Sequence, residues 1–179
     1  MDELTAVKAS QTGDRDAFGF LISQYYKSIY HYAYQLTGRS QDADDICQET
    51  FLRAYEGIKK LQNHRCFKGW IFMIATNLSR RHINKKRLAE KPSAGTSPKL
   101  FETENNEPFE NLSGREKAMI VQNHLLKMPE QMRMAAVLVH IEDFTQKEAA
   151  KMLNCSEATI SRQLYNAMNQ LRSKLKNLV

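Results

Sequence analysis

The sequence predicts an all-α protein with two small helical domains joined by a flexible acidic linker. Apolar residues recur at helical spacing along most of the 179 residues, and no alternating strand pattern persists. The stretch 89–113 holds three of the four prolines and little periodic apolar sequence, so it is predicted to be the linker. Near the C-terminus a capping box, a helix, a tight turn and a second helix follow directly. The expected domains are therefore 1–88 and 114–179.

Composition and charge restrict the classes of partner. The chain is 42% hydrophobic and 26% charged, which is typical of a folded protein with a core. Its 26 Lys and Arg against 20 Asp and Glu give a net charge of +6, which favours a polyanionic partner. No apolar run reaches membrane-spanning length, and the first 18 residues are acidic and polar, unlike a secretory signal. We expect a cytoplasmic protein without direct membrane insertion.

The first strong helical pattern runs from Phe18 to Leu36, and Gly38 is expected to end it. Ser40 is then expected to cap the next helix, whose two faces differ in character. Its apolar face is formed by Ala43, Ile46, Cys47, Phe51, Leu52, Tyr55 and Ile58, and its polar face by Asp42, Asp44, Asp45, Gln48 and Glu49. The polar face has two interpretations: carboxylates that suit the helix dipole, or a docking surface for a positively charged protein.

A polar, basic loop is predicted for 61–69, followed by a helix from Trp70. Six of the nine residues in 79–87 are Arg, Lys or His, which is too concentrated for an ordinary solvated face. The apolar side of this helix stops at Ile83, so a nucleic-acid backbone fits better than a membrane surface. Trp70 considered alone is more typical of a core residue than of a platform for stacking bases.

The three cysteines do not form a disulfide framework, because they are odd in number and widely spaced. A metal site of Cys47, Cys66, His64 and His82 is conceivable, but no pair has a zinc-ligand spacing. Buried free thiols are the preferred interpretation, with no metal and no cofactor. The sequence also lacks a phosphate-binding glycine loop and a nucleophile with a neighbouring base, so we do not expect an enzyme.

The C-terminal part begins with a helix through Met119 to Leu126, and a second starts after Met128-Pro129, with Met134, Val137, Leu138 and Ile141 facing inward. The stretch from Thr145 to Leu175 then predicts the helix-turn-helix. In it, Thr145 and Glu148 form the capping box, Asn154 suits a left-handed turn, and Ser156 caps the second helix. Ile160, Leu164, Ala167 and Leu171 form its apolar stripe. The alternative is an ordinary helical hairpin whose small residues only pack.

The residues opposite this stripe favour DNA. They are short hydrogen-bonding groups and cations, which suit base edges and phosphates better than a Glu- and Lys-rich solvated face does. They comprise Glu157, Thr159, Ser161, Arg162, Tyr165, Asn166 and Arg172, and Lys174 and Lys176 continue the helix.

Four stretches resemble the extracytoplasmic-function group of bacterial sigma-70 factors. Ala43–Leu52 is similar to A-E-D-L-x-Q-E-x-F-L, and Phe67–Asn77 to F-x-x-W-L-x-x-I-A-x-N. Met128–Arg133 is similar to L-P-E-x-x-R, and Glu148–Leu164 to the helix-turn-helix of the group. They occur in the order of the family and across an equivalent linker.

Two regions depart from the family pattern. Arg81 and Asn84 stand where the family usually has Asp and Arg, so a pair at i and i+3 is replaced and the helix is more basic. In the recognition helix, Arg162 shifts the first cation by one position, and Asn166 and Met168 replace later cations. The resemblance therefore does not transfer a promoter sequence preference.

The resemblance implies an alternative sigma factor that acts in stress responses. It would dock on the clamp and flap of core RNA polymerase, melt and bind the single-stranded −10 element, read the −35 duplex, and be held by an anti-sigma protein. The implied core contacts are Asp44, Asp45, Ile46, Gln48, Glu49, Phe51 and Leu52. The implied −10 contacts are Gln62, Asn63, His64, Arg65, Phe67, Lys68, Trp70, Asn77, Arg80, Arg81 and Lys85. The implied −35 contacts are Glu157, Thr159, Ser161, Arg162, Tyr165 and Asn166.

Two other classes of protein remain possible at this point. A helix-turn-helix repressor with an effector-binding N-terminal domain would bind duplex operator by itself, usually as a dimer, and would not need the acidic helix. A pure interaction protein would carry the basic helix without using it for nucleic acid.

Overall fold

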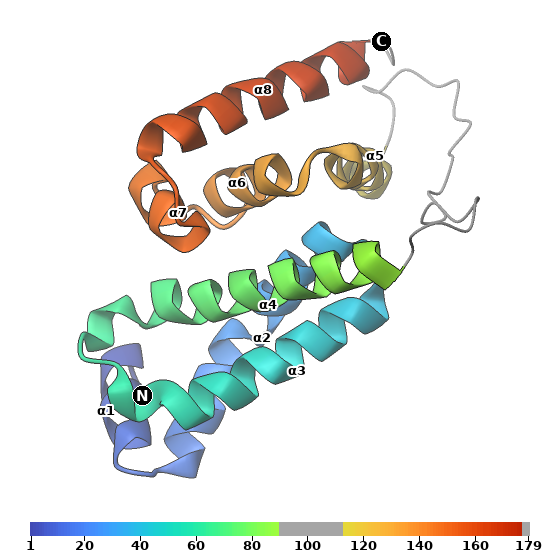
Figure 1. Ribbon diagram of the computed structural model, residues 1–179. Coiled ribbons are helices and arrows are strands. Elements are labelled where there is room, and N and C mark those ends of the chain that lie inside the picture. The colour runs from blue at the N-terminus through green and yellow to red at the C-terminus, as the bar shows by residue number, and fades with distance from the viewer. Residues whose placement is uncertain (90–112, 177–179) are drawn as a thin grey trace. The chain divides into compact units, whose positions relative to one another are not determined.

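The computed structural model describes the backbone of residues 1–89 and 113–176, and the side chains as far as Ser173 (Figure 1). All regular secondary structure in these ranges is helical, which confirms the predicted fold class. The chain divides into two compact units, 1–83 and 84–179. The predicted linker lies outside the described residues except at its two ends, because Ala89 ends a helix and Ser113 caps the next one.

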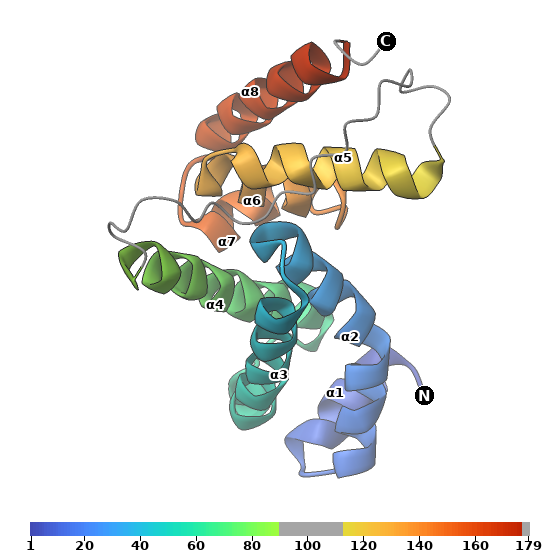
Figure 2. The same cartoon turned by 90° about the vertical axis from the view of Figure 1, so that its right-hand side faces the viewer.

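The N-terminal unit contains four α-helices and two 3-10 turns, and α2 packs on both α1 and α3 (Figures 1 and 2). The elements are α1 Glu3–Gln11, α2 Arg15–Thr37, α3 Ser40–Gly57, η1 Ile58–Lys60, η2 His64–Cys66 and α4 Phe67–Ala89, the last of which extends beyond the boundary at residue 83. The largest fully buried side chains of this unit include Tyr32 and Phe72, whose ring centroids lie 5.4 Å apart. The Tyr32 hydroxyl also lies 2.8 Å from that of Thr76, so the buried phenol keeps a polar partner.

Local capping explains where α2 begins and ends. Asp14 Oδ1 accepts hydrogen bonds from the amides of Asp16 and Ala17 at 2.9 and 3.0 Å, which satisfies two first-turn donors. Gly38 ends the helix with a φ of 70°, as predicted. The expectation that Ser40 caps the next helix is wrong. Arg39 has the extended backbone of the cap position, and Ser40 is the first residue of α3.

The C-terminal unit contains α5 Gly114–Lys127, α6 Glu130–His140, α7 Gln146–Leu153 and α8 Glu157–Lys176, and α6 packs on both α7 and α8. Arg133 fixes the corner between α5 and α6, because its Nη2 donates to the carbonyls of Leu126 and Met128 at 3.1 and 3.2 Å. Burial of this guanidinium lowers its pKa. The prediction that Ile141 faces inward is wrong: α6 ends at His140, and Ile141 is 37% exposed at the C-cap.

Candidate functional site

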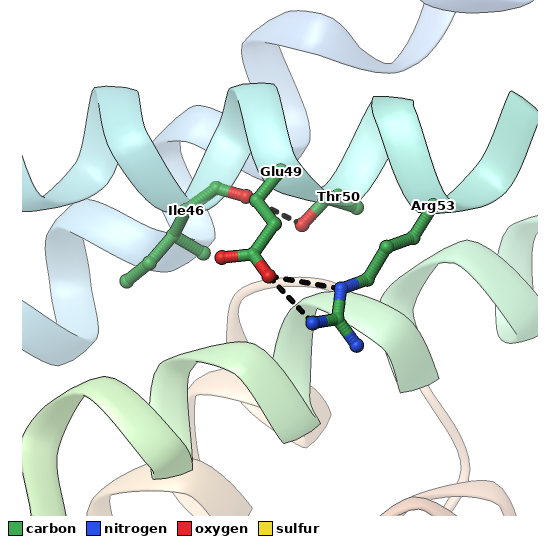
Figure 3. Close-up of polar contacts among 4 residues, drawn as sticks. All are labelled: Ile46, Glu49, Thr50 and Arg53. Atoms are coloured by element: carbon green, nitrogen blue, oxygen red, sulfur yellow. Dashed lines mark hydrogen bonds and ion pairs between the residues drawn. The ribbon is translucent and has the colours of Figure 1, made fainter. Parts of the chain in front are cut away.

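The polar face of α3 is open to solvent over Asp45, Gln48 and Glu49, whereas Asp44 is half-buried. Glu49 accepts two hydrogen bonds from Arg53, at 2.9 Å from Nε and 2.6 Å from Nη2 (Figure 3). Both side chains of this pair are 47% exposed, so water screens it and it adds little stability. The Glu49 carboxylate is thus held in place and remains accessible.

Two of the predicted core-polymerase contacts are buried. Ile46 is 3% exposed and Phe51 is 7% exposed, so both belong to the core of the N-terminal unit. Conversely, Leu52 and Tyr55 were placed on the apolar face, yet they are 59% and 41% exposed. The helical period explains the correction, because positions 45, 48, 49, 52 and 55 share one side of α3. The solvent-facing row therefore combines carboxylates with apolar groups.

Asp42 does not belong to the exposed acidic row. Its Oδ1 lies 3.3 Å from Nε2 of His82 on α4, and its side chain is only 15% exposed. This contact links the first turn of α3 to α4, which is therefore held against the helix that carries the acidic row.

The cysteines differ from one another in environment. Cys47 is buried, and burial together with the nearby Asp44 carboxylate raises the pKa of its thiol to about 12. Cys66 is exposed and Cys155 is half-buried, so the expectation of buried thiols is wrong for Cys66. Within the described ranges, no group of three His, Cys, Asp or Glu side chains is placed to hold a metal ion.

The predicted loop is shorter than expected and has a defined shape. Asn63 Oδ1 accepts from the amide of Arg65 at 3.1 Å, and the Asn63 carbonyl accepts from the amide of Cys66 at 3.0 Å. These bonds form the 3-10 turn η2, and α4 begins at Phe67 rather than at Trp70. The side chains of Gln62, Asn63, Arg65 and Lys68 are exposed, and that of His64 is half-buried.

Phe67, one of the predicted −10 contacts, is fully buried. Its ring centroid lies 5.5 Å from that of Tyr25 and 5.9 Å from that of Trp70. Trp70 is half-buried and packs against Gly57 so closely that a Cβ there would lie 3.2 Å from the indole. These three rings pack together where the loop ends and α4 begins, and the polar side chains of 62–65 are exposed or half-buried.

Polar and basic groups continue along α4. Asn77, Arg81 and Lys85 are four residues apart, so they lie on one row of the helix. Arg81 and Lys85 are exposed, as is Asn77, while Arg80 is half-buried beside the row. This arrangement presents an amide and two cations in a line, as contacts with successive phosphates require.

The helix-turn-helix of the C-terminal unit forms as predicted. Thr145 and Glu148 make the capping box of α7, and Asn154 ends this helix with a φ of 52°. Ser156 Oγ accepts from the amide of Thr159 at 3.1 Å at the start of α8. Ile160 and Ala167 are fully buried, whereas Leu171 is only half-buried. The side chains of Lys174 and Lys176 lie outside the described residues.

The opposite side of α8 carries the predicted DNA-binding residues. Five are exposed, namely Glu157, Ser161, Arg162, Tyr165 and Asn166. Thr159 is half-buried, and its hydroxyl lies 2.9 Å from that of Ser156 within the cap. The Ser161 hydroxyl donates to Oε1 of Gln146 on α7, a partner that the sequence did not identify. Arg162, Tyr165 and Asn166 are therefore the strongest candidates for new contacts.

Two protein-family models match separate parts of the chain. Residues 21–88 match the sigma-70 region 2 family, and residues 118–171 match sigma-70 region 4. The ECF RNA polymerase sigma factor SigW of Bacillus subtilis is 30% identical over 96% of each chain. The ECF RNA polymerase sigma-E factor of Haemophilus influenzae is 25% identical over 97% of this chain and 95% of its own.

Two solved structures share the fold. CnrH in complex with the cytosolic domain of CnrY has a TM-score of 0.73 at 22% identity, covering 98% of this chain and 97% of CnrH. The sigma factor RpoE of Bartonella quintana, in complex with the anti-sigma factor NepR, has a TM-score of 0.73 at 20% identity, covering 89% of this chain and 96% of RpoE. None of the described helices is both long and apolar enough to cross a membrane.

Proposed function

Because this chain belongs to the extracytoplasmic-function group of the sigma-70 family, it is an alternative RNA polymerase sigma factor, and we propose that its two units divide promoter recognition. Residues 1–88 would dock on core polymerase and bind the −10 element, residues 114–179 would read the −35 element, and 89–113 would link them. One observation supports this best. A single chain carries an exposed acidic and apolar row on α3, a polar loop with a basic helix, and an exposed polar face on a recognition helix.

Docking on core polymerase is assigned to the exposed row of α3. Asp45 and Glu49 would pair with cations of the polymerase clamp, and Leu52 and Tyr55 would bury their apolar surface against it. Charge steers the encounter, whereas the apolar groups supply affinity as water leaves them. Asp44 and Gln48 border this row, while Ile46 and Phe51 support it from below.

Recognition of the −10 element is assigned to the loop and to α4. Asn63, His64 and Arg65 offer hydrogen-bonding and stacking groups to an extruded base, and Gln62 and Lys68 flank them. Trp70 borders the loop with a half-buried ring. Arg81 and Lys85 would hold the phosphates of the separated strand, with Asn77 and Arg80 beside them. Extruding a base costs a few kcal/mol, which a fitted pocket and strand contacts offset.

Recognition of the −35 duplex is assigned to α8 in the major groove. Glu157, Ser161, Arg162 and Asn166 are groups that read base edges or bind phosphate, and Tyr165 adds a 69% exposed aromatic ring. The same unit would contact the polymerase flap.

The two structural relatives were solved with CnrY and with the anti-sigma factor NepR, so we propose that an anti-sigma protein also holds this chain. We place the chain in the cytoplasm, where the polymerase acts, and propose no catalytic activity of its own.

Transcription in vitro with core polymerase on genomic fragments tests this function. We expect the chain to direct transcripts from discrete start sites only when core is present. A repressor would instead bind duplex DNA tightly and specifically without core, and it would add no transcripts.

Asp45→Lys is expected to weaken binding to core polymerase by about 10–100-fold, because it reverses a charge in the docking row. Adding Glu49→Lys should weaken binding further. Gln24→Lys is the matched control, because it introduces the same lysine at an exposed position of α2. The affinity of each variant for core is measured by fluorescence anisotropy, with circular dichroism to verify helix content. Wild-type affinity in the double variant would contradict the docking assignment.

Arg162→Ala is expected to weaken binding to promoter DNA in one of two distinguishable ways. If Arg162 binds phosphate, affinity falls about equally for all promoters, and the log–log salt slope shrinks by about 0.9. If it reads a guanine, the loss is about 1–3 kcal/mol and is confined to one base position. Lys127→Ala removes an exposed cation from α5 as the control. Binding unchanged in both respects would exclude Arg162 from the interface.

A further inference from the structure

Helix α1 lies outside residues 21–88, which match sigma-70 region 2, yet it contacts the proposed −10 loop through η2. It packs on α2 and also contacts η1 and η2, the two turns that flank residues 61–63. Ala6 and Val7 are fully buried and account for the apolar packing of α1. Helix α1 also makes polar contacts through Gln11 and Glu3, one near each end of the loop.

The first polar contact is made by Gln11, the last residue of α1. Its Nε2 donates to the carbonyl of Ile58 at 2.9 Å and to that of Leu61 at 2.8 Å. A side-chain amide has two N–H groups, so both are used on the backbone that enters the loop. The Leu61 carbonyl immediately precedes Gln62, and the Gln11 side chain is half-buried, which protects both bonds from water.

The second contact reaches the other end of the loop. The Tyr25 hydroxyl on α2 donates to the Glu3 carboxylate in the first turn of α1. Burial, and next the hydrogen bond with Glu3, raise the pKa of Tyr25. The ring of Tyr25 packs against Phe67, the residue at which the loop ends and α4 begins. Glu3 is thus linked to Phe67, at the end of the loop, through the ring of Tyr25.

Helix α1 is itself firmly placed. Asp2 caps it through the amide and hydroxyl of Thr5, at 3.0 and 2.7 Å. At its other end the amide of Asp14 donates to the carbonyl of Ala9 at 3.1 Å, which fixes the turn into α2. These bonds define the two ends of α1, and its packing on α2 holds the helix in place.

We propose that α1 is a positioning element for −10 recognition, in which Gln11 sets the entry and Glu3, through Tyr25, sets the exit of the loop 62–66. This inference rests on the proposed function of that loop. Gln11 and Glu3 would not touch DNA. They would hold the polar groups of the loop in the arrangement that receives an unpaired base, so that less ordering is required when the base arrives.

Gln11→Glu in the full-length chain tests the positioning of the loop. The substitution keeps the size of the side chain but replaces the NH2 group, with its two N–H donors, by a carboxylate oxygen that faces two carbonyls. We expect hydrogen exchange of the Leu61, Arg65 and Cys66 amides to accelerate by about tenfold. Gln24→Glu, which adds the same charge on an exposed part of α2, should leave these amides unchanged. Tyr25→Phe keeps the ring on Phe67 and loses the bond to Glu3, so it should accelerate exchange chiefly at Cys66.

The functional arm uses the same variants bound to core polymerase, on a promoter fragment selected by transcription in vitro. Gln11→Glu should slow open-complex formation by about tenfold on duplex promoter, with little effect on core affinity. Unchanged exchange in both Gln11→Glu and Tyr25→Phe would overturn the inference. Faster exchange with normal melting would overturn it too, provided that Arg65→Ala impairs melting. If Arg65→Ala is also silent, the proposed function of the loop fails, and the positioning role fails with it.

Discussion

Phe67→Ala is expected to lower the free energy of unfolding of the N-terminal unit by about 3–5 kcal/mol, the usual cost of truncating a buried phenylalanine. Phe67 is fully buried between the rings of Tyr25 and Trp70, so alanine would leave a cavity where α4 begins. Such a loss is a large part of the stability of a small domain. Urea unfolding of the full-length chain, followed by circular dichroism, measures the shift in midpoint.

Met73→Ala provides the matched control for Phe67→Ala. Met73 is on the same helix and is 38% exposed, so its truncation should cost much less. The family resemblance placed Phe67 among the −10 contacts, and that role makes a different prediction. A variant with wild-type stability but defective promoter melting would show that Phe67 acts on DNA rather than in the core.

His64→Ala combined with Arg65→Ala is expected to slow open-complex formation by about 10–100-fold without weakening the binding of core. Capture of an extruded base must offset a few kcal/mol of unstacking, and these two side chains are the proposed ligands at the loop. Asn63 is left intact, because its side chain accepts a hydrogen bond from the amide of Arg65 and so shapes η2. A promoter with a premelted −10 bubble should recover part of the loss, since the unstacking cost is then already met.

Arg39→Ala serves as the control for the loop variant, because it removes an exposed cation from the corner between α2 and α3. Stopped-flow fluorescence of a labelled promoter measures melting, and a core-binding titration measures docking. Equal defects on duplex and premelted promoters would mean that the loop does not capture the extruded base. A parallel loss of core binding would instead place the loop at the polymerase interface.

Three helix ends were predictable from local signals in the sequence, whereas the local cap signal at Ser40 was misleading. Gly38, Asn154 and the capping box of Thr145 all behave as expected, because each depends on neighbouring backbone groups. Helix α1 was missed. Its apolar residues are few and small, and what fixes it are contacts made across the fold, such as Gln11 with Ile58 and Leu61. Single-sequence periodicity contains no signal for a bond between residues 47 positions apart.

The site residues were predictable as a region but not one by one. The sequence indicated the polar row of α3. A family motif, however, contains buried residues that support the surface as well as residues that make contacts, and Ile46 and Phe51 are buried. The apolar pattern places Leu52 and Tyr55 on the inner face of the helix, although the family resemblance also makes Leu52 a core-polymerase contact and the helical period places both beside Asp45. An exposed apolar residue at such a position was the signal that could have identified the row as a docking surface.

The packing of Trp70 against Phe67 and Gly57 has an optical consequence. The chain contains a single tryptophan, so all of its indole emission originates at the junction between the proposed −10 loop and α4. Half-burial leaves this fluorophore sensitive to changes in local polarity. The protein therefore carries a built-in, label-free probe at the place where strand capture is proposed, and none of its emission comes from the DNA-reading helix α8.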